Sequence, residues 1–237
     1  SVGPAFTVSG LDVSQSVNAQ IAIGLANGTA SNDDIVYEYV IDNGQNIERK
    51  QVSKKFGQLQ NTLTDNGSAL APTWTNNNWG LSTTTFVSPS SSITDSPNGI
   101  YSNSQNKRIT LTNPINLSGV TNATVSYAAK WELENGYDFV AFEVSTDNGL
   151  TWTEQCGKYT KSITPNTAEG TIPAYSGTQS DWINEEISLS DYAGQSIKVR
   201  FRLSTDVGTN LDGFYFDDFK VNLLQNSVLL ATQNNQV

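Results

Sequence analysis

Apolar side chains recur at every second position along most of this chain, whereas the three-to-four-residue spacing that is typical of an amphipathic helix is nearly absent. The clearest stretches lie at 125–133, 140–144, 183–189, 197–203 and 214–223. Because successive side chains of a strand point to opposite faces of a sheet, each stretch predicts a strand with one buried face. The chain is therefore predicted to be all-β.

The segments that connect these stretches are rich in turn-forming residues, and no long internal repeat is visible. About ten short strands over roughly 170 residues, joined in this way, are typical of a jelly-roll sandwich rather than a barrel or a propeller. Between Asp65 and Tyr101, prolines at 72, 89 and 97 favour ordered loops with short edge strands. We therefore predict a jelly-roll β-sandwich.

The first 55 residues carry a separate signal. Alternation over 35–41 leads to the pair Asn43-Gly44, which favours a tight hairpin turn. Three or four strands are too few for an independent sandwich, which usually needs about seven. The predicted organisation is a partial β-module over 1–55, a jelly-roll domain over 56–224, and a tail or linker over 225–237.

Histidine is absent from the 237 residues. Ser-His-Asp and Cys-His catalysis both need an imidazole that carries protons near neutral pH, and ordinary catalytic zinc sites include at least one histidine ligand. These classes of enzyme are therefore excluded. Methionine is absent too and the chain opens at Ser1, so we expect a segment of a longer polypeptide.

The formal net charge is −10. Such a chain repels phosphate backbones and anionic lipid surfaces, which argues against nucleic acid as a partner. No apolar run approaches the roughly 18 residues that a membrane span needs. The lone Cys156 cannot form a disulfide within the chain.

Residues 145–152 read S-T-D-N-G-L-T-W and match the Asp-box pattern S-x-D-x-G-x-T-W. Asp and Asn tolerate turn geometry, Gly supplies a positive φ, and the two hydroxyl side chains can bond across a hairpin. Sialidase-type propellers repeat this box several times, whereas it occurs once here. We interpret it as a hairpin staple rather than as a sialidase site.

Without histidine, carboxyl groups are the remaining candidates for proton transfer. A glycosidase needs two of them facing one cleft, roughly 5 to 10 Å apart. Neighbours in a strand point to opposite faces, and the E-x-D-x-x-E pattern of laminarinase-type jelly-roll glucanases is absent. We therefore predict no catalytic residues and keep a glycoside hydrolase as the third hypothesis. The closest carboxylate pairs are Glu132/Glu134, Glu185/Glu186 and Asp217/Asp218.

Aspartates beside turn residues suit a hard cation. Calcium takes 6 to 8 oxygen ligands from carboxylates, carbonyls and water. If Asp95, Asp217 and Asp218 gathered in one site together with Asp65, their mutual repulsion would require a cation. Aspartate is also a common turn-forming and capping residue, so the spacing alone leaves both readings open.

Aromatic residues in loops indicate a different function, in which flat rings stack on sugars. Trp74 and Trp79 flank three asparagines at 76–78, and Trp182 lies in a loop shortly after Tyr175. If a glycan platform exists, these four aromatic residues are its candidates. Packing in the core is the competing reading, because aromatic rings with one polar tip often pack at the ends of a sandwich.

Several segments between Lys54 and Leu223 carry a family resemblance. They are 54–57 (KKFG), 79–84 (WGLSTT), 92–101 (SITDSPNGIY), 156–160 (CGKYT) and 212–219 (DGFYFDDF). Together they resemble the MAM-like, immune-inhibitor-A-type jelly-roll module that is found C-terminal to zinc carboxypeptidase domains in secreted bacterial peptidases. The first 55 residues resemble the tail of an Ig-like β-module that often lies between the peptidase and the jelly roll.

The resemblance implies a non-catalytic accessory module, secreted or at the bacterial cell surface, whose partner is an upstream peptidase domain of the same polypeptide. It also implies a structural calcium ion, with Asp95 and Asp217 or Asp218 at the matching positions and Asp65 and Asp138 as further ligand candidates. The zinc motif of the peptidase is absent, so no carboxypeptidase activity is carried over. The alternative hypothesis is a carbohydrate-binding module that targets a secreted enzyme to glycans.

Overall fold

The computed structural model describes residues 2, 4–7, 23–26, 29, 33–42, 44–56, 60–165 and 170–225. The chain separates into two compact units, one made of Ser1–Gly57 with Leu229–Val237 and the other of Gln58–Val228. Asn43 and residues 226–237, for which the sequence predicts a turn position and a tail, lie outside the described residues.

The described part of the first unit contains an antiparallel hairpin from β1 (Asp34–Asp42) and β2 (Ile47–Lys55). The N–H of Gly44 donates a 2.8 Å hydrogen bond to Oδ1 of Asp42, at the turn. Gly44 has φ +82°, a left-handed conformation that glycine adopts without strain. The hairpin predicted here is confirmed, while the Ig-like character of this unit stays a prediction.

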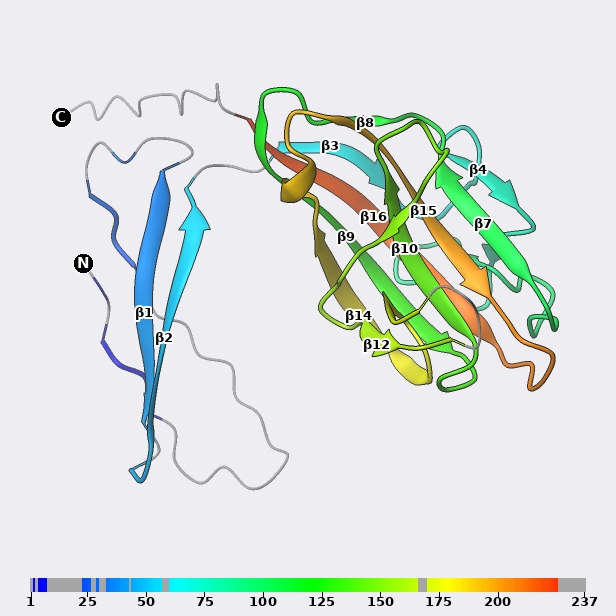
Figure 1. Ribbon diagram of the computed structural model, residues 1–237, viewed down its shortest axis with the longest axis horizontal. Coiled ribbons are helices and arrows are strands. Elements are labelled where there is room, and N and C mark those ends of the chain that lie inside the picture. Colours follow the sequence, from blue (N-terminus) through cyan, green and yellow to red (C-terminus); the bar gives the residue numbers. More distant parts are fainter. Residues whose placement is uncertain are drawn as a thin grey trace. The chain divides into compact units, whose positions relative to one another are not determined.

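The second unit is a sandwich of two antiparallel sheets (Figure 1). The β10 sheet has, in order, β11 (Thr153–Glu154), β10 (Phe139–Ser145), β15 (Ser196–Ser204), β7 (Asn106–Leu111) and β4 (Trp74–Asn77), and β8 (Ile115–Asn116) also pairs with β15. The β9 sheet has, in order, β14 (Thr178–Ser188), β9 (Val120–Glu132), β16 (Gly213–Gln225), β6 (Ser92–Thr94) and β5 (Gly80–Ser82), and β3 (Gln60–Asp65) also pairs with β16. The all-β, jelly-roll sandwich prediction is confirmed.

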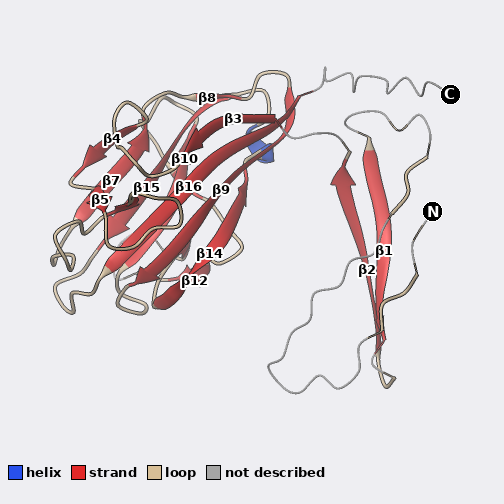
Figure 2. Cartoon of the chain, turned by 180° about the vertical axis from the view of Figure 1, so that it is seen from behind, coloured by secondary structure: helices blue, strands red, loops and turns tan. Residues whose placement is uncertain are grey.

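Two smaller features complete the described part of this unit. The strands β12 (Lys161–Ile163) and β13 (Ile172–Ala174) form a separate two-stranded ladder. The element η1 (Ser190–Tyr192) is a single turn of 3-10 helix, drawn in blue in Figure 2. No helix among the described residues has the length and apolar character that crossing a membrane requires.

Two connections cross between the sheets at the same end of the sandwich. One joins β9 to β10 through residues 133–138, and the other joins β15 to β16 through residues 205–212. At this end Phe139 of β10 pairs with Ser204 of β15, and Glu132 of β9 pairs with Gly213 of β16. The two crossovers therefore lie side by side.

The core lies between the two sheets and follows the alternation seen in the sequence. Ile197, Val199 and Phe201 of β15 are fully buried, and the ring of Phe201 stacks on Phe216 of β16 with 4.4 Å between centroids. Burying a side chain of this size stabilises a fold by roughly 1.5–3 kcal/mol. Because these residues pack between the sheets, the alternate side chains of each strand lie on the outer face of its sheet.

Candidate metal centre

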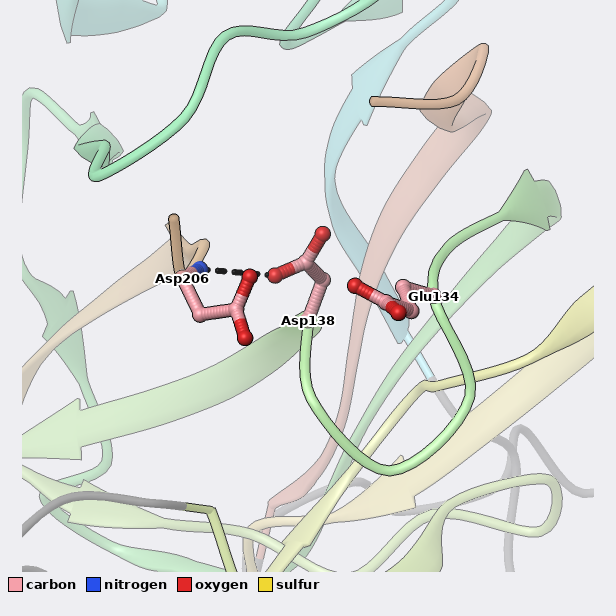
Figure 3. Close-up of side chains that lie close together, drawn as sticks. All are labelled: Glu134, Asp138 and Asp206. Atoms are coloured by element: carbon pink, nitrogen blue, oxygen red, sulfur yellow. Dashed lines mark hydrogen bonds between the residues drawn. The ribbon is translucent and has the colours of Figure 1, made fainter. Parts of the chain in front are cut away.

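Three carboxyl groups, those of Glu134, Asp138 and Asp206, meet where the two crossovers adjoin (Figure 3). One oxygen of each lies within 4.8 Å of the others. Glu134 and Asp138 come from the β9–β10 crossover, and Asp206 comes from the β15–β16 crossover. Figure 3 shows the carboxyl group of Asp138 between the other two.

Local backbone geometry sets these positions. The N–H of Asp138 donates a 3.0 Å hydrogen bond to the carbonyl of Glu134, which closes a tight turn. Gly136 lies inside that turn with φ +82°, where a residue with a side chain would be strained. The N–H of Asp206 donates a 2.8 Å hydrogen bond to Oδ1 of Asp138, the dashed line in Figure 3.

Two carboxylate oxygens of the cluster, Oδ2 of Asp138 and Oε2 of Glu134, are buried and make no hydrogen bond with any described residue. Asp138 as a whole is 0% exposed. Burial raises the pKa of Asp138, the N–H of Asp206 and the hydroxyl of Tyr101 oppose that rise, and the charges of Asp206 and Glu134 add to it. The cluster is therefore costly in its ionised form without a counter-ion.

A hard cation would relieve this cost. It would give the two buried oxygens a partner and would compensate the repulsion between carboxylates. Calcium binds oxygen and takes 6 to 8 ligands, so the three carboxyl groups can supply part of its shell and backbone carbonyls or water the rest. The chemistry of this donor set fits a calcium ion.

The sequence indicated only part of this cluster. Asp138 was among the predicted ligand candidates, Glu134 entered only as a member of a carboxylate pair, and Asp206 was missed. Asp206 lies in no motif, and its nearness to Asp138 depends on the pairing of β10 with β15. The signal in the sequence is that acidic residues lie in the connection before β10 and in the connection after β15. These two connections meet once the strands pair antiparallel.

Asp95 lies elsewhere, just after β6, and is fully buried. Its Oδ1 accepts a 2.6 Å hydrogen bond from the N–H of Phe214, while its Oδ2 has no hydrogen-bond partner among the described residues. Burial raises the pKa of Asp95 to about 7, against the opposing effects of the Phe214 N–H and of Lys107. A Cβ atom at Gly213 would lie 2.8 Å from Oδ1 of Asp95, so the glycine of the D-G-F-Y-F-D-D segment makes room for the aspartate of T-D-S-P.

The carboxyl groups of Asp217 and Asp218 accept hydrogen bonds from a neighbouring loop. Oδ2 of Asp217 accepts hydrogen bonds from the N–H groups of Val87 and Ser88 at 2.7 and 2.9 Å. Its Oδ1 accepts a 2.7 Å bond from the N–H of Asp218, whose own Oδ1 accepts a 2.8 Å bond from the Ser88 hydroxyl. Both carboxyl groups thus hold the loop against β16, which is the turn-capping reading of these residues.

Asp65 lies near Asp217 but not near Asp95. Oδ1 of Asp65 accepts a 2.8 Å hydrogen bond from the N–H of Gly67, and a Cβ atom at Gly67 would lie 3.0 Å from Oδ1 of Asp217. Asp95 is opposite Phe214, three residues before Asp217 and so roughly 10 Å along the strand. The structure therefore does not gather Asp95 with Asp217 and Asp218 in one site.

The four aromatic residues considered for a glycan platform do not form an exposed row. Trp74, Trp79 and Tyr175 are 3%, 4% and 0% exposed and pack in the core. Trp182 is half-buried, with the Lys130 ammonium 6.0 Å from its ring centroid. Three of the four candidates therefore follow the core-packing alternative, because the two sheets close over their rings.

The Asp-box forms the turn between β10 and β11, as predicted. Oδ1 of Asp147 accepts hydrogen bonds from the Ser145 hydroxyl at 2.7 Å and from the N–H of Thr151 at 2.9 Å. These bonds lower the pKa of Asp147. Trp152 folds back, and its Nε1 donates a 3.0 Å bond to the carbonyl of Gly149.

Comparison with protein families gives one match that covers most of the sandwich. Residues 78–234 match the family model described as "Immune inhibitor A-like, MAM domain". Among curated relatives, PrtV, a pre-pro-metalloprotease of Vibrio cholerae, is 28% identical over 120 residues, which are 51% of this chain and 12% of PrtV. Immune inhibitor A of Bacillus thuringiensis subsp. alesti is 30% identical over 115 residues, 48% of this chain and 15% of the relative.

Bacillopeptidase F of Bacillus subtilis is 30% identical over 149 residues, which are 61% of this chain and 9% of that protein. The matched segments are thus small parts of much longer relatives. Among solved structures, the CBM22-1 xylan-binding domain of Paenibacillus barcinonensis Xyn10C is 13% identical, with a TM-score of 0.44 over 70% of this chain and 96% of that one. The K3 adhesin domain of Lys-gingipain from Porphyromonas gingivalis is 17% identical, with a TM-score of 0.43 over 68% and 99%. These low scores carry no argument about function.

Proposed function

This chain belongs to the immune inhibitor A-like MAM domain family, and we propose that it is a non-catalytic, calcium-stabilised accessory module of a secreted bacterial zinc peptidase. The names of two relatives, a metalloprotease and a peptidase, support a peptidase as the parent. The lack of histidine supports a module without hydrolytic chemistry of its own.

The partner in this proposal is a peptidase domain upstream in the same polypeptide, and the location is extracellular or at the cell surface. A carboxypeptidase as the parent is the narrower form of the proposal and rests on the resemblance of the sequence alone. A glycan-binding role through the four predicted aromatic residues has no support, because Trp74, Trp79 and Tyr175 are buried.

The observation that carries the calcium part is the pair of buried, unpartnered oxygens on Asp138 and Glu134. Asp138, Glu134 and Asp206 would hold the ion, which would neutralise their charges and tie the two crossovers together. An ion that binds the native state at about a hundred times its dissociation constant adds roughly 2.7 kcal/mol to the free energy of unfolding. For a domain of this size that corresponds to a rise of a few degrees in the melting temperature.

The test is thermal unfolding of the full chain after metal removal, with added calcium, magnesium or chelator. Calcium should raise the midpoint, and magnesium should do so much less, because it demands a tight octahedron and loses water reluctantly. Asp138→Asn and Glu134→Gln remove one charge each with little change of shape and should abolish the response. Asp218→Asn is the matched control, because that carboxyl group contacts the Ser88 hydroxyl instead.

Two results would overturn the site. One is a wild-type midpoint that neither calcium nor chelator moves. The other is a calcium response that survives in both cluster variants but is lost in Asp95→Asn or Asp218→Asn, which would move the ion to the positions that the family resemblance implies.

A further inference from the structure

The outer face of the β10 sheet, which points away from the core, carries a row of cationic side chains. On β15, Lys198, Arg200 and Arg202 occupy alternate positions between the buried core residues. Arg108 of β7 pairs directly with Arg202, and Thr110 pairs with Arg200. Cross-strand partners share a face, so these four cations lie on one surface.

Two of the four cations are neutralised within the sheet. Glu143 of β10 binds both Arg200 and Arg202, the latter at 2.6 Å, and Arg202 also contacts Glu154 at 3.2 Å. These pairs are largely buried, which fixes their positions.

The side chains of Arg108 and Lys198, by contrast, make no hydrogen bond or ion pair with any residue in the described ranges. Among the described residues, this face carries four positive side chains and the carboxylates Glu143 and Glu154, and Asp147 lines a hollow beside Lys198. The chain as a whole has a net charge of −10. This face differs from the chain as a whole, in which carboxylates outnumber cationic side chains. It creates a local field that attracts anions.

Two adjoining hollows of about 380 and 310 Å³ lie over this face. They share Arg108 and Trp152, and the larger one also reaches Lys198. The Trp152 ring is held by the Asp-box turn and has the Arg200 guanidinium 4.0 Å from its centroid. The other polar residues lining the hollows are mainly amide and hydroxyl side chains, namely Thr75, Asn76, Asn77, Asn106, Thr110, Thr112 and Asn148.

We propose that the outer face of the β10 sheet binds an acidic oligosaccharide, whose carboxylate or sulfate groups pair with Arg108 and Lys198. Amide and hydroxyl side chains exchange hydrogen bonds with sugar hydroxyls, since each can donate and accept. The half-buried indole ring of Trp152 lines both hollows, and the part of it that the Arg200 guanidinium leaves open can contact a sugar ring. An acidic peptide would meet the same charges, but it has few hydroxyl groups for the amide and hydroxyl lining, so the sugar is favoured.

This site is independent of the metal centre and of the peptidase proposal, because it uses other residues on another part of the fold. It also differs from the glycan platform considered from the sequence. The residues that carry it are Arg108 and Lys198, whose side chains have no partner among the described residues, together with Trp152 of the Asp-box turn. Binding would hold the protein at surfaces rich in acidic glycans.

The test is isothermal titration of the full chain with three probes: hyaluronan oligosaccharides, heparin-derived oligosaccharides and neutral dextran oligosaccharides. At least one acidic probe should bind saturably and more weakly as salt rises, and dextran should not bind. The two acidic probes distinguish a carboxylate from a sulfate as the recognised group. Arg108→Gln or Lys198→Gln should each weaken binding roughly tenfold, because each removes a charge-assisted hydrogen bond.

Arg49→Gln is the matched control, since it also removes one positive charge but lies on β2, paired with Glu38. It should leave binding unchanged, and all three variants should melt like the wild type. The proposal is overturned if neither acidic probe binds, or if binding is equal in the face variants and the control. It is also overturned if poly-glutamate binds as tightly as the sugars and loses affinity in the same variants, which would make the face a site for acidic peptides.

Discussion

The hydroxyl group of Tyr175 donates a 2.9 Å hydrogen bond to Oε2 of Glu185 inside the second unit. The hydroxyl of Tyr127 lies 2.7 Å from that of Tyr175, and burial raises the pKa of both tyrosines well above the usual range. The N–H groups of Lys158 and Tyr159 donate to the two oxygens of Glu185 at 2.7 and 2.9 Å. A single buried carboxylate thus anchors the C-G-K-Y-T segment to β14.

Replacing that carboxylate should destabilise the fold strongly. Glu185→Leu leaves the N–H groups of Lys158 and Tyr159 without their acceptor, and each orphaned donor costs roughly 1–3 kcal/mol. We expect the free energy of unfolding to fall by about 2 to 5 kcal/mol, measured by urea denaturation. Glu186→Leu is the control on the exposed face of the same strand and should change stability by less than about 0.5 kcal/mol. Equal effects of the two substitutions would contradict the anchoring role.

The stability of the chain should fall as the pH rises from about 4 to 7 in metal-free buffer. Asp95 has a folded pKa of about 7, above its ordinary value of 3.8, so the native state binds its proton more tightly than the unfolded state does. Such a group contributes stability that is fully present below the unfolded pKa and is lost as the pH rises through the folded pKa. The loss is a few kcal/mol at most, because one pKa unit corresponds to about 1.4 kcal/mol.

Asp95→Asn should flatten this pH dependence, because the amide does not ionise. Urea unfolding at pH 5 and pH 8 measures the difference, with the exposed Asp181→Asn variant as control. A wild-type slope that persists undiminished in Asp95→Asn would show that another group is responsible.

No hydrolytic activity is expected from this chain. Histidine is absent, and both carboxylate oxygens of Glu185 accept hydrogen bonds within the fold, so this group is not free to transfer protons. Incubation with panels of peptides and glycans, analysed by mass spectrometry, should show no turnover. Turnover that disappears in Glu132→Gln, Glu134→Gln or Glu185→Gln would refute the non-catalytic proposal.

Residues 1–55 should not fold when isolated, whereas residues 56–224 should. A two-stranded hairpin is marginal by itself, and Val36, Val40, Ile41 and Ile47 of β1 and β2 are exposed. Circular dichroism melting of the two fragments distinguishes them, with a cooperative transition expected only for the longer one. Cooperative melting of residues 1–55 would show that they form an independent domain.

Local signals in the sequence were sufficient for the long strands and the Asp-box turn, although Trp182, expected in a loop, lies in β14. The alternation at 197–203 predicts β15 because burial on one face of a strand imposes a period of two. The Asp-box predicts its turn because all of its interactions are local. Asp147 accepts a hydrogen bond from the N–H of Thr151, and Asn148 and Gly149 adopt positive φ values. The family resemblance likewise rests on short segments, such as T-D-S-P and D-G-F-Y-F-D-D. In the structure these two segments lie against each other, with Asp95 of the first beside Gly213 of the second.

The sequence by itself determined the all-β class, the long alternating strands, the hairpin turns and the exclusion of histidine-based chemistry, because each depends on residues close together in the chain or on composition. Only the tertiary structure decided which carboxylates meet. Asp206 reaches Asp138 across 68 positions because β10 pairs with β15, and Asp95 stays apart from Asp217 because both are fixed at different points along β16. Spacing in sequence cannot supply such distances, since they depend on the register and the order of strands that are far apart in the chain.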